Sequence, residues 1–144
     1  MKNHHPIFLI LLLFLASCAI EPQPINYGKD ACHYCKMNIV DSQHAAQFVT
    51  EKGKCYKFDA IECMLNQMKE FDEAPIALYL VSDYTNPGEL TDATTATYLI
   101  TEAIPSPMGA FLTAFETQEK AVLTHDETNG LLLGWNKLIA KYGL

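Results

Sequence analysis

The 144-residue sequence predicts an α+β fold made of two small tandem ββαβ units. In each half, short β-branched and aromatic segments alternate with one helical pattern. Asn86-Pro87-Gly88, a strong turn signal, separates the halves. We therefore divide the chain into units at residues 32–85 and 86–144. The halves share no evident sequence identity, so the repeat is one of pattern only.

In the first unit we expect strands at residues 37–50 and 55–58, a helix at residues 59–71 and a strand at residues 76–81. Asp59 to Glu62 has the form of a capping box with Asp59 as the N-cap, which begins the helix. The apolar positions of that helix follow the i, i+3, i+4, i+7 spacing of a buried stripe: Ile61, Met64, Leu65 and Met68.

In the second unit we expect strands at residues 94–100, 110–115 and 131–135, with a helix at residues 118–125. Pro105-Ser106-Pro107 predicts a rigid loop between the first two strands, and Asn129-Gly130 predicts a turn. A last helical segment is expected from the spacing of its apolar residues: Trp135, Leu138, Ile139 and Tyr142.

The first residues have the pattern of an export signal. Lys2 is followed by an apolar run at residues 7–16, about ten residues, where a membrane span needs about 20. Leu15-Ala16-Ser17-Cys18 resembles the bacterial lipobox, in which the cysteine is lipidated and becomes the N-terminus. We predict a signal peptide at residues 1–17, and a lipid anchor and spacer at residues 18–31. The mature protein would then be a membrane lipoprotein facing the periplasm.

The composition argues against two classes of function. The net charge is −7 and all ten basic residues are Lys, so the clustered positive charge that nucleic acid requires is missing. No Ser/His/Asp order, phosphate-binding loop or pair of catalytic carboxylates is evident. We therefore expect a protein that is not an enzyme.

The segment Cys32-His33-Tyr34-Cys35-Lys36-Met37 concentrates possible metal ligands. Cys32 and Cys35 are spaced too closely for a typical structural disulfide, and such a pair is more often a metal or redox site. Thiolate and thioether are soft ligands that select Cu(I) over Mg, Ca or Mn. The alternative is that Met37 is only the first core residue of its strand.

Further candidates lie outside that segment. Met108-Gly109 follows the Pro-rich loop, where a methionine is less expected in the core than on a helix stripe. Cys63 should lie opposite the apolar stripe of its helix and face solvent, the other half or the Cys32/Cys35 loop. Cys55 has no assignable partner. The histidines of the mature chain are isolated, which favours structural or surface roles, and His33 is the best ligand candidate among them: His33, His44 and His125.

These pieces together resemble the NosL family of copper-binding accessory lipoproteins of nitrous oxide reductase. The resemblance rests on the order and spacing of the following residues: Cys18; Cys35-Lys36-Met37-Asn38-Ile39 with Asp41; Ala46-Gln47; Phe58-Asp59; Glu62-Cys63-Met64; Asp83; Asp92-Ala93 with Ala96 and Tyr98; Met108-Gly109; and Ala114-Phe115.

The resemblance implies two treble-clef-like ββαβ units and a Cu(I) carrier that supplies the copper centres of the reductase. By position it implies Cys35, Met37 and Met108 as ligands. Lys36 stands where the family usually has Gly, and Cys32 is an additional thiol. Cys32 either adds a ligand or oxidises with Cys35 and blocks the site.

Our main hypothesis is a membrane-tethered Cu(I) metallochaperone that uses Cys35, Met37 and Met108, with Cys32 or Cys63 as a further ligand. Its partners would be nitrous oxide reductase as recipient and a membrane copper exporter or other donor. Two alternatives remain open. One is a thiol–disulfide oxidoreductase that uses Cys32 and Cys35, and the other is a structural zinc module that uses the four cysteines after Cys18 for protein interaction.

Overall fold

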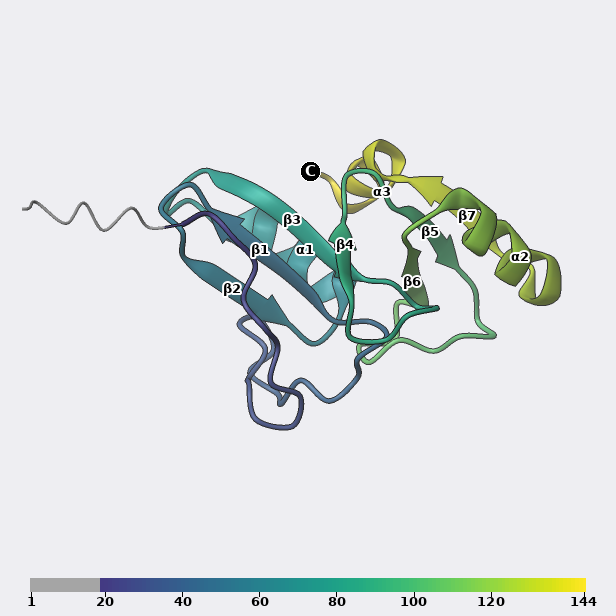
Figure 1. Cartoon of the computed structure of the whole chain (residues 1–144). Coiled ribbons are helices and arrows are strands. Elements are labelled where there is room, and N and C mark those ends of the chain that lie inside the picture. The colour runs from purple at the N-terminus through teal and green to yellow at the C-terminus, as the bar shows by residue number, and fades with distance from the viewer. Residues whose placement is uncertain (1–18) are drawn as a thin grey trace, which may run out of the picture.

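The structure is a computed structural model that describes residues 19–144 (Figure 1). In chain order the elements are β1 (Ala46–Thr50), β2 (Cys55–Phe58), α1 (Ile61–Glu70), β3 (Ile76–Ser82), β4 (Leu90–Asp92), β5 (Thr97–Ile100), β6 (Leu112–Phe115), α2 (Gln118–Thr128), β7 (Leu131–Gly134) and α3 (Trp135–Tyr142). The predicted signal peptide and Cys18 lie outside the described residues. Within residues 19–144, no helix is both long enough and apolar enough to cross a membrane.

The two antiparallel sheets repeat one arrangement. The first has the strand order β2-β1-β3-β4, and the second has the order β6-β5-β7. In each sheet the first strand of the ββαβ unit lies between the second strand and the strand that follows the helix. The predicted α+β class and the repeated ββαβ pattern are therefore confirmed. Figure 1 shows the two sheets side by side, with α1 behind the first sheet and α2 at the outer end of the second.

β4 is the strand that the sequence did not predict. It follows the turn at residues 86–88 and pairs with β3 through three residues, including Leu80 opposite Asp92. The predicted strand at residues 94–100 begins only at Thr97, because the side chain of Asp92 holds a turn. Its Oδ1 accepts hydrogen bonds from the backbone N–H of Thr94 at 2.8 Å and from its hydroxyl at 2.7 Å. β4 thus belongs to the first sheet, although it follows the predicted division between residues 85 and 86. That division of the chain into two units stays a prediction.

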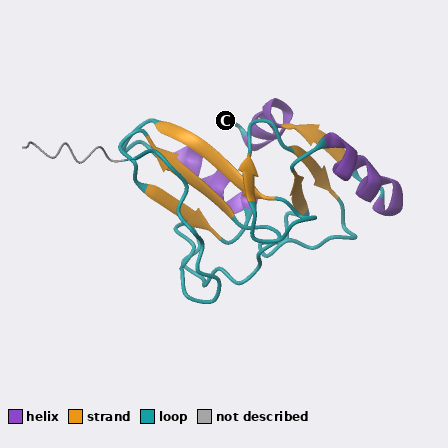
Figure 2. Ribbon diagram, viewed as in Figure 1, coloured by secondary structure: helices purple, strands orange, loops and turns teal. Residues whose placement is uncertain are grey.

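The predicted strand at residues 37–50 is wrong over its first nine residues. The chain there is loop, apart from a single bridge between Ala31 and Asn38, and β1 begins at Ala46 (Figure 2). Asp41 explains the difference because its carboxylate accepts the backbone N–H of Gln43 at 2.7 Å. An Asp side chain that bonds the backbone two residues on forms a turn instead of continuing a strand.

Helix α1 lies where the sequence predicts a helix, but the predicted N-cap at Asp59 is wrong. Its N-cap is Ala60, which makes no side-chain capping bond. The carboxylate of Asp59 instead accepts a hydrogen bond from the backbone N–H of Val40 at 3.4 Å. The stripe residues Ile61, Met64 and Leu65 are buried as expected, and Met68 is half-buried.

The two units share one hydrophobic core. Buried side chains of the first sheet and α1 are continuous with those of β5, β6 and α3: Phe48, Phe58, Met64, Leu65, Tyr98, Leu112 and Leu138. Trp135 packs between the units, with its ring centroid 5.4 Å from that of Tyr79 and 6.3 Å from that of Tyr98. Because α1 contacts both the first sheet and the second unit through β6 and α3, both faces of its first turns are covered.

Candidate metal centre

The loop at residues 32–37 folds into a tight knuckle that brings two cysteines together. The backbone N–H of Cys32 donates to the carbonyl of Met37 at 2.7 Å, and that of Lys36 donates to the carbonyl of Cys32 at 3.0 Å. The backbone N–H of Cys35 donates to the sulfur of Cys32 at 3.5 Å. Lys36 has a φ of 66°, in the left-handed region that favours glycine. The chain thus reverses direction immediately after the second cysteine.

Helix α1 contributes the third thiol. Cys63 lies in its first turn, and the Sγ atoms of Cys32, Cys35 and Cys63 all lie within 4.8 Å of one another. With metal–sulfur bonds of about 2.3 Å, three thiolates around one ion stand about 4 Å apart, so small side-chain shifts suffice for binding. All three thiols are free, and only Cys35 is less than fully buried. We call these three residues the thiol cluster.

The pKa values of the three thiols in the cluster are shifted in different directions. Hydrogen bonding from the Cys63 thiol, followed by the backbone N–H groups of Asp59 and Cys35, lowers the pKa of Cys32 to about 5. The same bond to Cys32, together with burial, raises the pKa of Cys63, and burial raises that of Cys35. The cluster at neutral pH therefore holds one thiolate and two thiols. A metal ion that binds all three sulfurs must displace the remaining protons.

Cys63 is a stronger candidate for a metal ligand than its sequence pattern indicated, because it lies beside Cys32 and Cys35. The helical spacing put it opposite the apolar stripe, and among the alternatives considered the Cys32/Cys35 loop is the one that it faces. It is 1% exposed. The helical spacing could not choose among these alternatives, because the second face of α1 is covered by chain segments far away in sequence. Cys55 is not part of the thiol cluster, and burial raises the pKa of its thiol.

The two predicted thioether ligands lie at the surface. Met37 is 50% exposed and Met108 is 43% exposed, so neither serves the core. Met37 is the last residue of the knuckle, and its carbonyl accepts the hydrogen bond from the backbone N–H of Cys32. Met108 lies in the loop before β6, where Gly109 has a φ of 76°. The exposure excludes the alternative that Met37 is a core residue, while the ligand role of both methionines stays a prediction.

The histidines have structural contacts outside the thiol cluster. His44 is buried, with Nδ1 at 2.9 Å from Asp41 and Nε2 at 3.4 Å from the hydroxyl of Thr113 in β6. Both ring nitrogens are thus engaged, so His44 has no free ligand atom. The ring of His33 packs edge-on against Tyr56 at 4.6 Å, and burial lowers its pKa. His125 lies near Asp126 on α2.

The geometry weighs against both alternative sites. A thioredoxin-like pair precedes a long helix, whereas Cys35 is followed by loop and the next helix begins at Ile61. A four-cysteine zinc site is not formed among residues 19–144, because Cys55 lies outside the thiol cluster. Structural zinc sites almost always have four protein ligands, so three thiols leave such a site incomplete.

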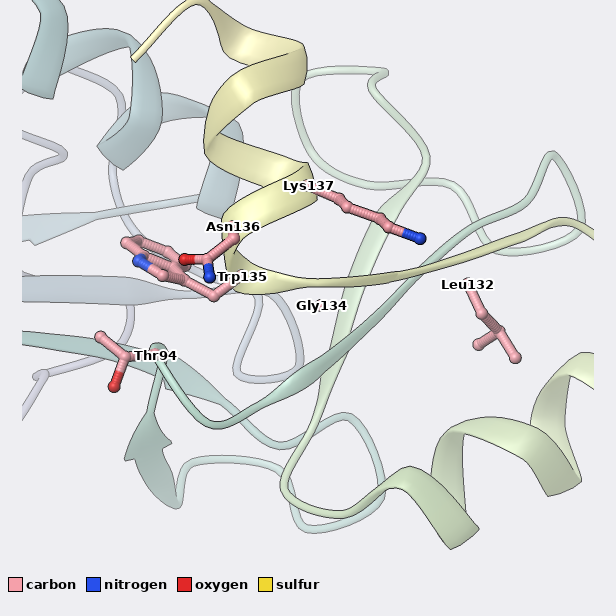
Figure 3. A pocket seen from close by; sticks show the side chains of 6 residues that line it. All are labelled: Thr94, Leu132, Gly134, Trp135, Asn136 and Lys137. Atoms are coloured by element: carbon pink, nitrogen blue, oxygen red, sulfur yellow. The ribbon is translucent and has the colours of Figure 1, made fainter.

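A surface pocket on the second unit is chemically different from the thiol cluster. It has a volume of about 320 Å³ and is lined by Thr94, Leu132, Gly134, Trp135, Asn136 and Lys137. Figure 3 shows Thr94 and Trp135 on one side of Gly134, with Leu132 on the other. None of these residues is a cysteine, methionine or histidine, so this pocket is not the metal centre.

Comparisons with known proteins agree with the fold and with the resemblance. The sequence profile of the NosL family matches residues 24–142. The crystal structure of the copper chaperone NosL from Shewanella denitrificans aligns with a TM-score of 0.70 and 17% sequence identity, covering 82% of this chain and 95% of that one. A search of curated proteins gave no significant sequence match. With the family profile spanning most of the sequence, the chain belongs to the NosL family.

Proposed function

We propose that this protein is a membrane-tethered Cu(I) metallochaperone that delivers copper for assembly of the copper centres of nitrous oxide reductase. The observation that carries the proposal is the convergence of three thiols in a member of the NosL family. Thiolates are soft ligands, which favour Cu(I). Copper is here the cargo, and the role is not enzymatic.

The proposed ligand set joins buried thiols to exposed thioethers. Cys35 belongs both to the thiol cluster and to the set implied by the family, together with Met37 and Met108. Its sulfur is the only one of the three thiols that is not fully buried. A carrier needs such an opening, because the ligands of a partner protein must replace its own one at a time. The two surface methionines supply weak ligands at that opening.

The proposed anchor at Cys18 would hold the domain close to the membrane. The spacer is bound to the first sheet at Gln23, whose backbone N–H donates to the side-chain carbonyl of Gln47 at 2.9 Å. The amide of Gln47 donates in return to the carbonyl of Gln23 at 2.8 Å. Gln23 is five residues along the chain from Cys18, a stretch that extends to at most about 18 Å. A lipid at Cys18 therefore restricts the chaperone to the periplasmic surface, where a membrane copper exporter releases its metal.

The binding proposal is tested by titrating the reduced mature domain with Cu(I) against a chromogenic chelator. We expect one tight site that is weakened in Cys35→Ser and Met108→Ala. Cys55→Ser is the matched control and should bind like the parent, because Cys55 is a half-buried thiol outside the thiol cluster. If Cys35→Ser and Met108→Ala hold copper as tightly as the parent, the site assignment is wrong.

Two further measurements separate the alternative functions. Metal analysis after anaerobic purification should show no stoichiometric zinc, and a full equivalent of zinc would favour a structural zinc module. An insulin-reduction assay should show no activity above background, and catalytic turnover would favour an oxidoreductase.

The delivery and localisation proposals need an experiment in cells. Cys18→Ser should move the protein from the membrane fraction to the soluble periplasmic fraction. Cys35→Ser should leave it in the membrane but lower the copper content of nitrous oxide reductase. Normal copper loading of the reductase in cells that lack the chaperone would contradict the delivery proposal.

A further inference from the structure

Glu62 is a buried carboxylate at the junction of the two units. It lies in the first turn of α1, directly before Cys63, and is 4% exposed. Its Oε1 accepts the hydroxyl of Ser106 at 2.6 Å and the backbone N–H of Ala110 at 3.4 Å. Glutamate is almost never fully buried unless it is paired, so this position requires an explanation.

The two donors bracket Met108. Ser106 lies two residues before it and Ala110 two residues after it, and both donate to the same oxygen of Glu62. The loop is further closed by the backbone N–H of Gly109, which donates to the carbonyl of Ser106 at 3.0 Å. One carboxylate on α1 therefore fixes both ends of the segment that carries Met108.

The other oxygen of Glu62 argues against a role in stability alone. Oε2 is buried and has no hydrogen-bond partner. A buried acceptor that is left unpaired costs free energy, and native proteins tolerate few of them. An apolar contact between α1 and the loop would join the units without that cost. The carboxylate of Glu62 is thus better explained by the precise placement of the loop that it binds through Ser106 and Ala110.

We propose that Glu62 is a positioning residue that sets Met108 of the second unit against the thiol cluster of the first. The copper site is then assembled across both units, and Glu62 acts on the metal only through Met108. This inference rests on the proposed function, because it presupposes that Met108 is a copper ligand. The same turn of α1 thus supplies the thiol of Cys63 and the anchor of the Met108 loop.

The test is a double-mutant cycle on Cu(I) affinity, measured by chelator competition with the reduced mature domain. In the parent, Met108→Ala should weaken binding by about tenfold, or about 1.4 kcal/mol. In a Glu62→Ala background the same change should have almost no effect, because Met108 is no longer held at the site. Equal effects of Met108→Ala in both backgrounds would overturn the proposal.

Two conservative variants keep the test decisive if Glu62→Ala does not fold. Glu62→Gln retains a carbonyl oxygen for Ser106 and Ala110, so the tenfold effect of Met108→Ala should return. Ser106→Ala removes the shorter bond from the loop side and should reduce that effect. X-ray absorption of the Cu(I)-loaded variants should show the thioether ligand in Glu62→Gln and its loss in Ser106→Ala. The same sulfur ligands in every variant, including Glu62→Ala where it folds, would overturn the role of Glu62.

The outcomes also separate this inference from the proposed function. If the parent binds no Cu(I), the proposed function fails. If the parent binds Cu(I) through its cysteines but Met108→Ala has no effect, the proposed function stands and the positioning role of Glu62 is wrong.

Discussion

The two ββαβ units have the same strand arrangement but very different chemistry. In each, the first strand is central and the strand after the helix pairs with it from the other side. All four cysteines of the described chain belong to the first unit or to the loop that precedes its first strand. In the proposed copper site, the second unit contributes only the loop with Met108. Strand topology therefore does not determine the site, which is built from a loop and a helix end.

The helices of the two units explain the difference. The first five residues of α1 are buried, from Ile61 to Leu65, whereas Ala121 is the only buried residue of α2. α1 lies between the first sheet and the second unit, while α2 packs mainly on its own sheet and reaches the first unit through Lys120, whose Nζ lies 2.6 Å from Oδ2 of Asp83. A helix N-terminus also carries partial positive charge, which favours thiolates near it. A buried helix N-terminus beside a cysteine knuckle is thus the arrangement that the second unit lacks.

The largest expected effect is on copper binding by the first unit. Cys63→Ser removes the thiol that α1 contributes, and we expect Cu(I) affinity to fall by about 100-fold or more, since even outer contacts of a metal site are worth about 10- to 100-fold. Chelator competition measures the change, with Cys55→Ser as control. Unchanged affinity in Cys63→Ser would show that the thiol cluster is not the copper site.

The second effect is on the pH dependence of stability. The pKa of Cys32 is about 5 in the folded protein and 9.0 in its ordinary environment, so folding releases a proton between these values. The contribution to stability is present above pH 9 and is lost as pH falls towards 5. Cys35 and Cys63 have raised pKa values and act in the opposite direction only above their ordinary range.

Thermal unfolding of the reduced, metal-free protein across that pH range tests this effect. The Tm should rise with pH in the parent and in Cys55→Ser, and this rise should be flatter in Cys32→Ser. An identical slope in Cys32→Ser would contradict the assignment of the thiolate to Cys32.

A smaller effect concerns the knuckle itself. Lys36 occupies the left-handed region at a φ of 66°, where a side chain costs about 1 kcal/mol that glycine avoids. Lys36→Gly should therefore raise the free energy of unfolding by about 1 kcal/mol in urea titrations. Lys29→Gly is the matched control in the same region of chain, since Lys29 is exposed and outside the left-handed region. Lys29→Gly should lower the free energy of unfolding. A higher free energy of unfolding in both variants would point to a general effect of glycine.

The smallest effect is expected at the outer helix. Thr117 caps α2 by accepting a hydrogen bond from the backbone N–H of Lys120 at 3.4 Å. Thr117→Ala should cost about 0.5 kcal/mol of stability, at the low end for caps because the bond is long. Thr117→Ser should retain the bond and the stability. Cu(I) affinity should stay at the parent value in both, and a change would show that α2 is coupled to the site.

The sequence by itself determined most elements of the fold and the pairing of two of the three cysteines in the thiol cluster. β2, β3, α2 and α3 follow from local periodicity and turn residues, and the knuckle follows from the spacing of Cys32 and Cys35. The sequence missed β4, which is only three residues long, and it misassigned residues 37–45, where the carboxylate of Asp41 forms a turn.

Only the tertiary structure decided which distant residues meet. Cys63 joins the knuckle across 28 residues of chain, and Glu62 reaches Ser106 across 44. Periodicity shows that a helix has an apolar face, but not what covers its other face. That second face is decided by the packing of the two units on α1, a contact that depends on the whole chain. The physical reason is that burial is a property of the assembled core, whereas periodicity is a property of a single segment.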